Sequence, residues 1–267
     1  MKRWIVLAAM ALSANLAYAI DEKAADELLQ QTENSVGLNK LRQLAEQGDM
    51  IAQDRVGFAY LSGRGVNRDL DTARTWLQKA ADRGYAFSQA RLGFIYANAL
   101  GVEKDPANAA SWYARAAEQG NVAASYNLGL MRSEGGSLPK DEVMAAKWFR
   151  IAAEKGLAEA QLNLGALYMS EALKRNYTEA LRWLSKAADA GNAKAMLNLA
   201  GMYQNGWGVR QDDAAALGWL EKAAAGGDWM AMGAISNAYK EGTLGLNKDL
   251  DKADEWYRKY IQAQLRR

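Results

Sequence analysis

The side chains that could perform chemistry in this chain are carboxylates, lysine, serine and tyrosine, because its 267 residues contain no histidine and no cysteine. Without histidine there is no Ser-His-Asp triad, and without both types there is no Cys-His pair and no zinc or haem site of the usual kind. Disulfide bonds are excluded as well, so packing alone must stabilise the fold. We therefore expect no catalytic residue, no metal ligand and no cofactor.

Two local patterns could still be taken for active-site motifs. Ser137 and Lys140 match the Ser-x-x-Lys pattern of serine β-lactamases, but Pro139 interrupts it and no Ser-Asp-Asn or Lys-Thr-Gly segment accompanies it. Gly-x-Gly segments recur without a preceding strand or a following Gly-Lys-Ser/Thr, so we interpret them as structural turns. A cell-wall or β-lactam hydrolase is the rival hypothesis from the enzyme class.

The first nineteen residues have the plan of a secretory signal peptide. Lys2 and Arg3 precede an apolar run from Trp4 to Leu12, and the segment ends in Ala17-Tyr18-Ala19. Nine apolar residues rise about 13 Å as a helix, well short of a ~30 Å hydrocarbon core. We expect cleavage after Ala19, a periplasmic location and no stable membrane anchor afterwards. The formal charge of +2 then falls to zero, which gives no general attraction to nucleic acid.

Tryptophans recur along the rest of the chain at spacings of 36, 36, 35, 36 and 37 residues. Such a period indicates a repeat architecture. The six tryptophans are Trp76, Trp112, Trp148, Trp183, Trp219 and Trp256. We place them in the core, with Trp148 packed between adjacent repeats.

Each copy is predicted to form two helices. Ala52, Val56 and Tyr60 lie four residues apart, which makes one helical stripe, and the stripe around Trp76 makes the second. Gly57 follows the stripe residue of the first helix, and its lack of a side chain lets another helix approach closely. Aspartates at the repeat spacing are placed to cap the second helices. They are Asp69, Asp105, Asp141, Asp212 and Asp249.

The recurring text is Ala-x-x-x-Leu-Gly-x-x-Tyr, a Gly-x-Gly-Val loop, and Ala-x-x-Trp-x-x-Lys-Ala-Ala-x-x-Gly. It resembles the Sel-one-like repeat family, relatives of the tetratricopeptide repeats. The resemblance implies an all-α fold, a right-handed α-α superhelix (solenoid) of about six helix pairs. We place the repeats within 49–267, at about 49–84, 85–120, 121–156, 157–191, 192–227 and 228–267. Residues 20–48 are expected to form a divergent capping helical hairpin, and the junctions of copies four and six to be irregular.

The resemblance also implies that the first helices line a concave binding side. The position before the stripe residue carries asparagine in three consecutive copies, and amides can pair with the backbone of an extended peptide. The alternative is that these asparagines serve the repeat itself. Trp207 lies in a loop, where it either anchors an interface or folds back on its own hairpin. The predicted partner-binding residues are Asn127, Asn163, Asn198, Arg55, Arg91, Tyr126, Phe94 and Trp207. The flanking candidates are Phe58, Phe87, Leu130, Leu162, Met169, Leu197 and Met230.

These features together predict an exported, non-catalytic scaffold or adaptor that holds a protein or peptide in its groove. Neither nucleic acid nor a small-molecule cofactor is expected. Family members include immunity proteins, so the resemblance leaves open neutralisation of a periplasm-acting effector such as a phospholipase.

Overall fold

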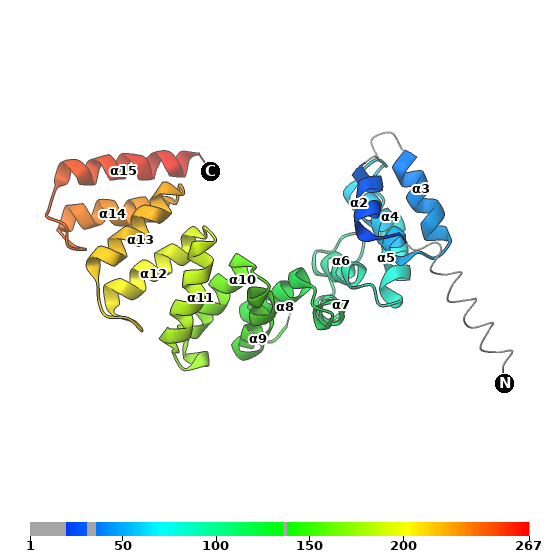
Figure 1. Cartoon of the computed structure of the whole chain (residues 1–267), viewed down its shortest axis with the longest axis horizontal. Coiled ribbons are helices and arrows are strands. Elements are labelled where there is room, and N and C mark those ends of the chain that lie inside the picture. Colours follow the sequence, from blue (N-terminus) through cyan, green and yellow to red (C-terminus); the bar gives the residue numbers. More distant parts are fainter. Residues whose placement is uncertain (1–19, 31–35, 136–137, 267) are drawn as a thin grey trace. The chain divides into compact units, whose positions relative to one another are not determined.

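The computed structural model describes residues 20–30, 36–135 and 138–266, and this part of the chain is helical throughout, with no strand (Figure 1). The predicted signal peptide and Ser137 lie outside the described residues. The chain divides into two compact units, and the division falls after Leu128, inside helix α8. The two units are described separately below.

The first unit holds the capping helices and the first two helix pairs. Its helices are α2 (Glu22–Gln30), α3 (Val36–Glu46), α4 (Met50–Ser62), α5 (Leu70–Asp82), α6 (Ala86–Ala97), α7 (Pro106–Glu118) and the start of α8 (Val122–Glu134). The second unit continues with α9 (Glu142–Glu154), α10 (Ala158–Tyr168), the 3-10 turn η2 (Glu171–Leu173), α11 (Tyr177–Asp189), α12 (Ala193–Asn205), α13 (Asp213–Ala225), α14 (Trp229–Glu241) and α15 (Leu250–Leu265). Within each unit, successive helices pack on one another, most extensively in the pairs α4–α5, α6–α7, α10–α11, α12–α13 and α14–α15. The helix-pair solenoid predicted from the repeat is confirmed.

The repeated glycine of the first helix explains how closely the helices of a pair approach. A Cβ atom on Gly57 would lie 2.7 Å from Cγ of Leu77, and one on Gly165 would lie 2.7 Å from Cγ of Leu184. Such separations are shorter than van der Waals contact, so no side chain fits. The predicted close approach is confirmed, and the helices that approach each other are the two of the same repeat.

The predicted core placement is confirmed for Trp112 and Trp183, which are 8% and 1% exposed, and is wrong for the other four tryptophans, which are half-buried. The sequence analysis put Trp148 in the core, but its side chain is only half-buried, while Phe149 is 1% exposed and fills that place. Adjacent helical positions differ by about 100°, and in α9 it is Phe149 that faces Gly129 of the first helix. Trp76 is likewise half-buried beside a fully buried Leu77. The residues after the tryptophan that are buried in this way are Leu77, Tyr113, Phe149, Leu184 and Leu220.

A lysine covers the outer face of several of these tryptophans. Nζ of Lys79 lies 4.1 Å from the ring centroid of Trp76, and the pairs Lys222–Trp219 and Lys259–Trp256 have the same arrangement at 4.2 and 4.1 Å. A cation over an aromatic face is attracted by the ring quadrupole. The Trp-x-x-Lys spacing of the repeat therefore places each lysine one helical turn above its tryptophan.

The predicted helix caps are confirmed. The five repeat aspartates each accept a hydrogen bond from a backbone N–H in the first turn of their helix. Helix α11 is capped by Asn176 instead, in the copy that lacks the loop glycines. There Lys174 and Arg175 adopt φ values of 56° and 46°, which non-glycine residues rarely do, so this junction is irregular as expected. Among the described helices, none is long and apolar enough to cross a membrane.

Candidate functional site

An apolar groove opens in the first unit, between helices α4, α6 and α8. Its volume is about 590 Å³. Phe87 and Phe94 of α6 line it with 43% and 47% of their surface exposed, which is high for large apolar side chains. The lining residues are Phe58, Leu61, Phe87, Ala90, Arg91, Phe94, Gly120, Asn121, Val122, Ala123 and Asn127. The groove therefore lies along first helices of consecutive repeats, the side on which the resemblance placed the partner.

Arg91 is the charged residue of this lining, and it is held in place from two sides. The Cζ atom of its guanidinium group lies 4.7 Å from the ring centroid of Phe58. Its Nη1 atom donates to both carboxylate oxygens of Asp54, at 2.5 Å each. Because the positive charge is already paired, the groove presents mainly the apolar faces of its phenylalanines.

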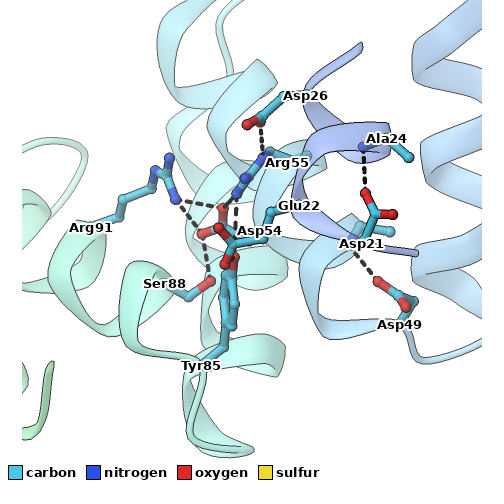
Figure 2. A network of polar contacts seen from close by, with 11 residues as sticks. Asp21, Glu22, Ala24, Asp26, Asp49, Asp54, Arg55, Tyr85, Ser88 and Arg91 are labelled. Atoms are coloured by element: carbon cyan, nitrogen blue, oxygen red, sulfur yellow. Dashed lines mark hydrogen bonds and ion pairs between the residues drawn. The ribbon is translucent and has the colours of Figure 1, made fainter. Parts of the chain in front are cut away.

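Asp54 is the centre of a buried polar network (Figure 2). Its side chain has no exposed surface, and it accepts hydrogen bonds from Nη1 of Arg55 at 2.6 Å and from Oγ of Ser88 at 2.7 Å, in addition to Arg91. A buried carboxylate is costly unless it is paired and hydrogen-bonded, and here both oxygens are bonded. The network therefore joins α4 to α6 directly beneath the groove.

Arg55 extends the network to the capping helices. Its Nε atom donates to Asp26 of α2 at 2.5 Å. Burial acts to lower the pKa of Arg55, but the hydrogen bond to Asp26 and the charge of Asp54 outweigh it, so the pKa is raised and the guanidinium stays charged. Tyr85 lies on the other side, where its hydroxyl donates to Glu22 at 3.1 Å. Burial and the charge of Asp54 raise the pKa of Tyr85 to about 12.

The structure brings three of the predicted partner-binding residues together, namely Arg91, Phe94 and Asn127, all of which line the groove. Arg55 lies beneath them with 7% of its side chain exposed, where it pairs with carboxylates of the chain itself. Tyr126 is half-buried on α8, outside the lining residues. The groove thus unites residues from three repeats. Arg55 is connected to this lining through Asp54, which also pairs with Arg91.

Asn127 also has a contact inside the protein. Its side chain is hydrogen-bonded to the hydroxyl of Tyr113, a buried residue of α7. Burial raises the pKa of Tyr113 to about 12, and the bond to Asn127 acts in the opposite direction. This asparagine therefore serves the packing of its neighbourhood as well as lining the groove.

The other two asparagines of the predicted ladder belong to the second unit. Asn163 on α10 and Asn198 on α12 are both half-buried. Leu197, next to Asn198, lines a second depression of about 420 Å³ between α12, α13 and α14. The ladder of three amides stays a prediction.

Trp207 stacks on a neighbouring repeat. Its ring lies 5.7 Å from that of Tyr177 at the start of α11, with an interplanar angle of 12°. A Cβ atom on Gly208 would lie 2.8 Å from Cβ of Tyr177, so the glycine permits this contact. Trp207 therefore packs on the preceding copy rather than on its own hairpin, and it remains 39% exposed, so its role as an interface anchor stays a prediction.

The sequence analysis missed Asp54. At the same position the other copies carry Ala90, Tyr126, Leu162, Leu197 and Gly233, so a carboxylate there departs from the repeat. That departure was the available signal, since a charge on an apolar stripe needs a partner. Among the described residues, no group of three acidic side chains is placed to hold a metal ion.

Comparison with known proteins gives one family and several related structures. The model of the Sel1 repeat matches six consecutive segments, at residues 51–85, 86–121, 122–157, 158–192, 193–228 and 229–262. No curated protein matches the chain.

Among solved structures, the chain resembles c5321, a protective antigen present in uropathogenic Escherichia coli strains that displays an SLR fold. The identity is 35% and the TM-score 0.79 over 87% of this chain, which spans 51% of the length of that one. A Sel1 repeat protein from Oxalobacter formigenes is 30% identical with a TM-score of 0.69, over 87% of this chain and 96% of that one. The immunity protein Pa5087 from Pseudomonas aeruginosa is 23% identical with a TM-score of 0.44, over 80% and 81% of the two chains.

Proposed function

We propose that this chain, which belongs to the Sel1 repeat family, is an exported, non-catalytic scaffold that binds a partner protein in the groove of its first unit. Sel1 repeats mediate protein–protein interaction, which is the coarse function of the family. Export is supported by the signal-peptide plan of residues 1–19.

The observation that carries the proposal is the exposed phenylalanine pair of the groove. Phe87 and Phe94 stand on one face of α6 around a hollow of about 590 Å³, and apolar concave surfaces of this kind mark interaction sites. Their backbone is fixed by the polar network around Asp54, so the groove is formed before a partner arrives. Preorganisation of this kind lowers the entropy lost on binding.

The chemistry of the lining defines the partner segment. Arg91 is neutralised by Asp54, so the groove offers apolar rings and the amide groups of Asn121 and Asn127 rather than a net charge. We therefore expect an uncharged, extended segment of a partner protein, with an aliphatic or aromatic side chain seated between Phe87 and Phe94.

The test is a comparison of three versions of the chain in affinity capture from an envelope extract, followed by measurement of the affinity for the captured protein. Wild type and the control V143A should retain the partner, since Val143 is 49% exposed but lies in the second unit. The double variant F87A/F94A should lose it while its circular dichroism spectrum is unchanged. A partner that binds F87A/F94A as tightly as wild type would show that the groove is not its site.

The identity of the captured protein decides the narrower role. An endogenous envelope protein supports an adaptor, whereas a secreted effector, such as a phospholipase, supports immunity. Assays of the purified chain with a chromogenic β-lactam and with peptidoglycan check the non-catalytic assignment, and turnover in either would refute it.

A further inference from the structure

The backbone nitrogen of Ile20 is bound to a residue that is distant in the sequence. It donates a hydrogen bond to Oδ2 of Asp49 at 3.0 Å, while Oδ1 of Asp49 accepts from the backbone nitrogen of Ala52 at 2.7 Å and caps α4. The two carboxylate oxygens of Asp49 therefore accept two different bonds. Oδ1 caps helix α4, and Oδ2 binds the backbone 29 residues upstream.

Ile20 is also held by its side chain. The side chain of Ile20 packs, partly buried, against the apolar cluster that includes Leu29, Leu38 and Leu41. The next residue, Asp21, accepts a hydrogen bond from the backbone nitrogen of Ala24 at 2.7 Å and so caps α2 (Figure 2). The residue that follows the predicted cleavage site is thus held by both its backbone and its side chain.

We infer that Asp49 is the binding site of the mature amino terminus, in an ion pair with the α-ammonium group of Ile20. The inference rests on the proposed export, because it needs residues 1–19 to be removed. Hydrolysis of the Ala19–Ile20 peptide bond by a signal peptidase consumes one water molecule. Ala19 leaves with a carboxylate, and Ile20 keeps an amine, which takes up a proton near neutral pH.

Cleavage leaves the donor atom in place and changes its charge. The neutral amide N–H that faces the Asp49 carboxylate becomes an ammonium group, so the attraction between two opposite charges is added to the existing hydrogen bond. The start of α2 is an unfavourable place for a positive charge because of the helix dipole. The carboxylate of Asp49 supplies the compensation, so processing tightens the attachment of the capping hairpin to the first repeat.

The test compares two purified chains, one beginning at Ile20 and one with the additional residue Ala19, each with and without D49N. Asparagine caps a helix about as well as aspartate, so D49N removes the charge and keeps the cap of α4. Amide hydrogen exchange in α2, followed by mass spectrometry, reports opening of the hairpin. We expect D49N to raise exchange about three-fold more in the chain that begins at Ile20 than in the longer chain.

The control variant is D228N, because Asp228 caps α14 in the second unit through the same bond to a backbone nitrogen, that of Ala231. It should change exchange in α14 equally in both chains. An equal effect of D49N in the two chains would overturn the ion pair. The start of the exported chain, read by mass spectrometry of periplasmic material, tests the export proposal separately, since the two purified chains report on Asp49 whatever that start is.

Discussion

The carboxylate of Asp54, which has no exposed surface, lies 2.5 Å from Nη1 of Arg91, a residue of the next repeat whose guanidinium group also covers the ring of Phe58. One side chain thus links a buried charge to the wall of the groove. The guanidinium group that covers Phe58 in the groove is therefore held by an ion pair between repeats. Removing that pair should affect both stability and binding.

Replacement of Asp54 by alanine should be strongly destabilising. The variant leaves Arg55 buried without one of its carboxylate partners, and breaking a buried pair costs about 3–5 kcal/mol. Urea denaturation followed by circular dichroism measures the change. D71A is the matched control, because the pair of Asp71 with Arg74 is mostly exposed and should contribute little. A loss no greater than that of D71A would contradict the structural role of the network.

The two adjacent aromatic residues of helix α9 should respond differently to alanine. Phe149 is 1% exposed, so F149A should lower the unfolding free energy by about 3–5 kcal/mol and broaden the transition, since repeats contact only their neighbours. W148A should lower the unfolding free energy clearly less, because Trp148 is only half-buried. Thermal unfolding of both variants checks this order, and a larger effect of W148A would restore the tryptophan to the core.

Two helical glycines should give opposite results on conversion to alanine. A Cβ atom on Gly165 would lie 2.7 Å from Cγ of Leu184, so G165A should destabilise by about 1–3 kcal/mol through overpacking. Gly201 has no atom within 4 Å of the added Cβ, so G201A should be neutral or stabilise by up to about 1 kcal/mol. The midpoints of urea unfolding distinguish the two. Similar values for both variants would mean that Leu184 gives way at little cost.

The tyrosine at position 113 should ionise only in strong alkali. Burial raises its pKa to about 12, above the ordinary value of 10.0. The folded chain therefore holds this proton more tightly than the unfolded chain, and the resulting stability is complete below about pH 10 and is lost as the pH rises through 12. Absorbance titration at the tyrosinate band should show one late-ionising group fewer in Y113F. An unchanged titration curve would show that Tyr113 ionises normally.

The asparagines of the second unit test the predicted amide ladder. Because the proposed groove lies in the first unit, N163A/N198A should leave the affinity for the captured partner unchanged. The amide ladder instead predicts a loss of about 2 kcal/mol or more, because each amide bond left unmade in a desolvated groove costs ~1–3 kcal/mol. Asn163, like Asn127, has a contact inside the protein, so the fold of the variant is checked beside its affinity. Isothermal titration beside circular dichroism makes the measurement. Full affinity in the folded double variant would confine the partner to the groove of the first unit.

Much of the architecture follows from the sequence alone. The period of the tryptophans, the apolar stripes and the capping aspartates are local signals, and each needs only the neighbouring turn of helix to act. Gly57 and its equivalents also indicated close helix contact, since the absence of a side chain at that position can be read from the sequence. The groove residues Arg91 and Asn127 could be proposed because they share one repeat position, and Phe94 because it lies one helical turn after Arg91.

The tertiary structure decided which of two adjacent side chains is buried and which charge is paired. Trp148 and Phe149 are both large and apolar, so the sequence does not separate them, and only the packing of α9 shows that Phe149 is buried and Trp148 half-buried. Arg55 looked like a groove residue, but its guanidinium pairs with Asp26 and Asp54, from two different helices. Pairing of this kind depends on the direction in which long side chains point across helices, which spacing along the chain does not specify.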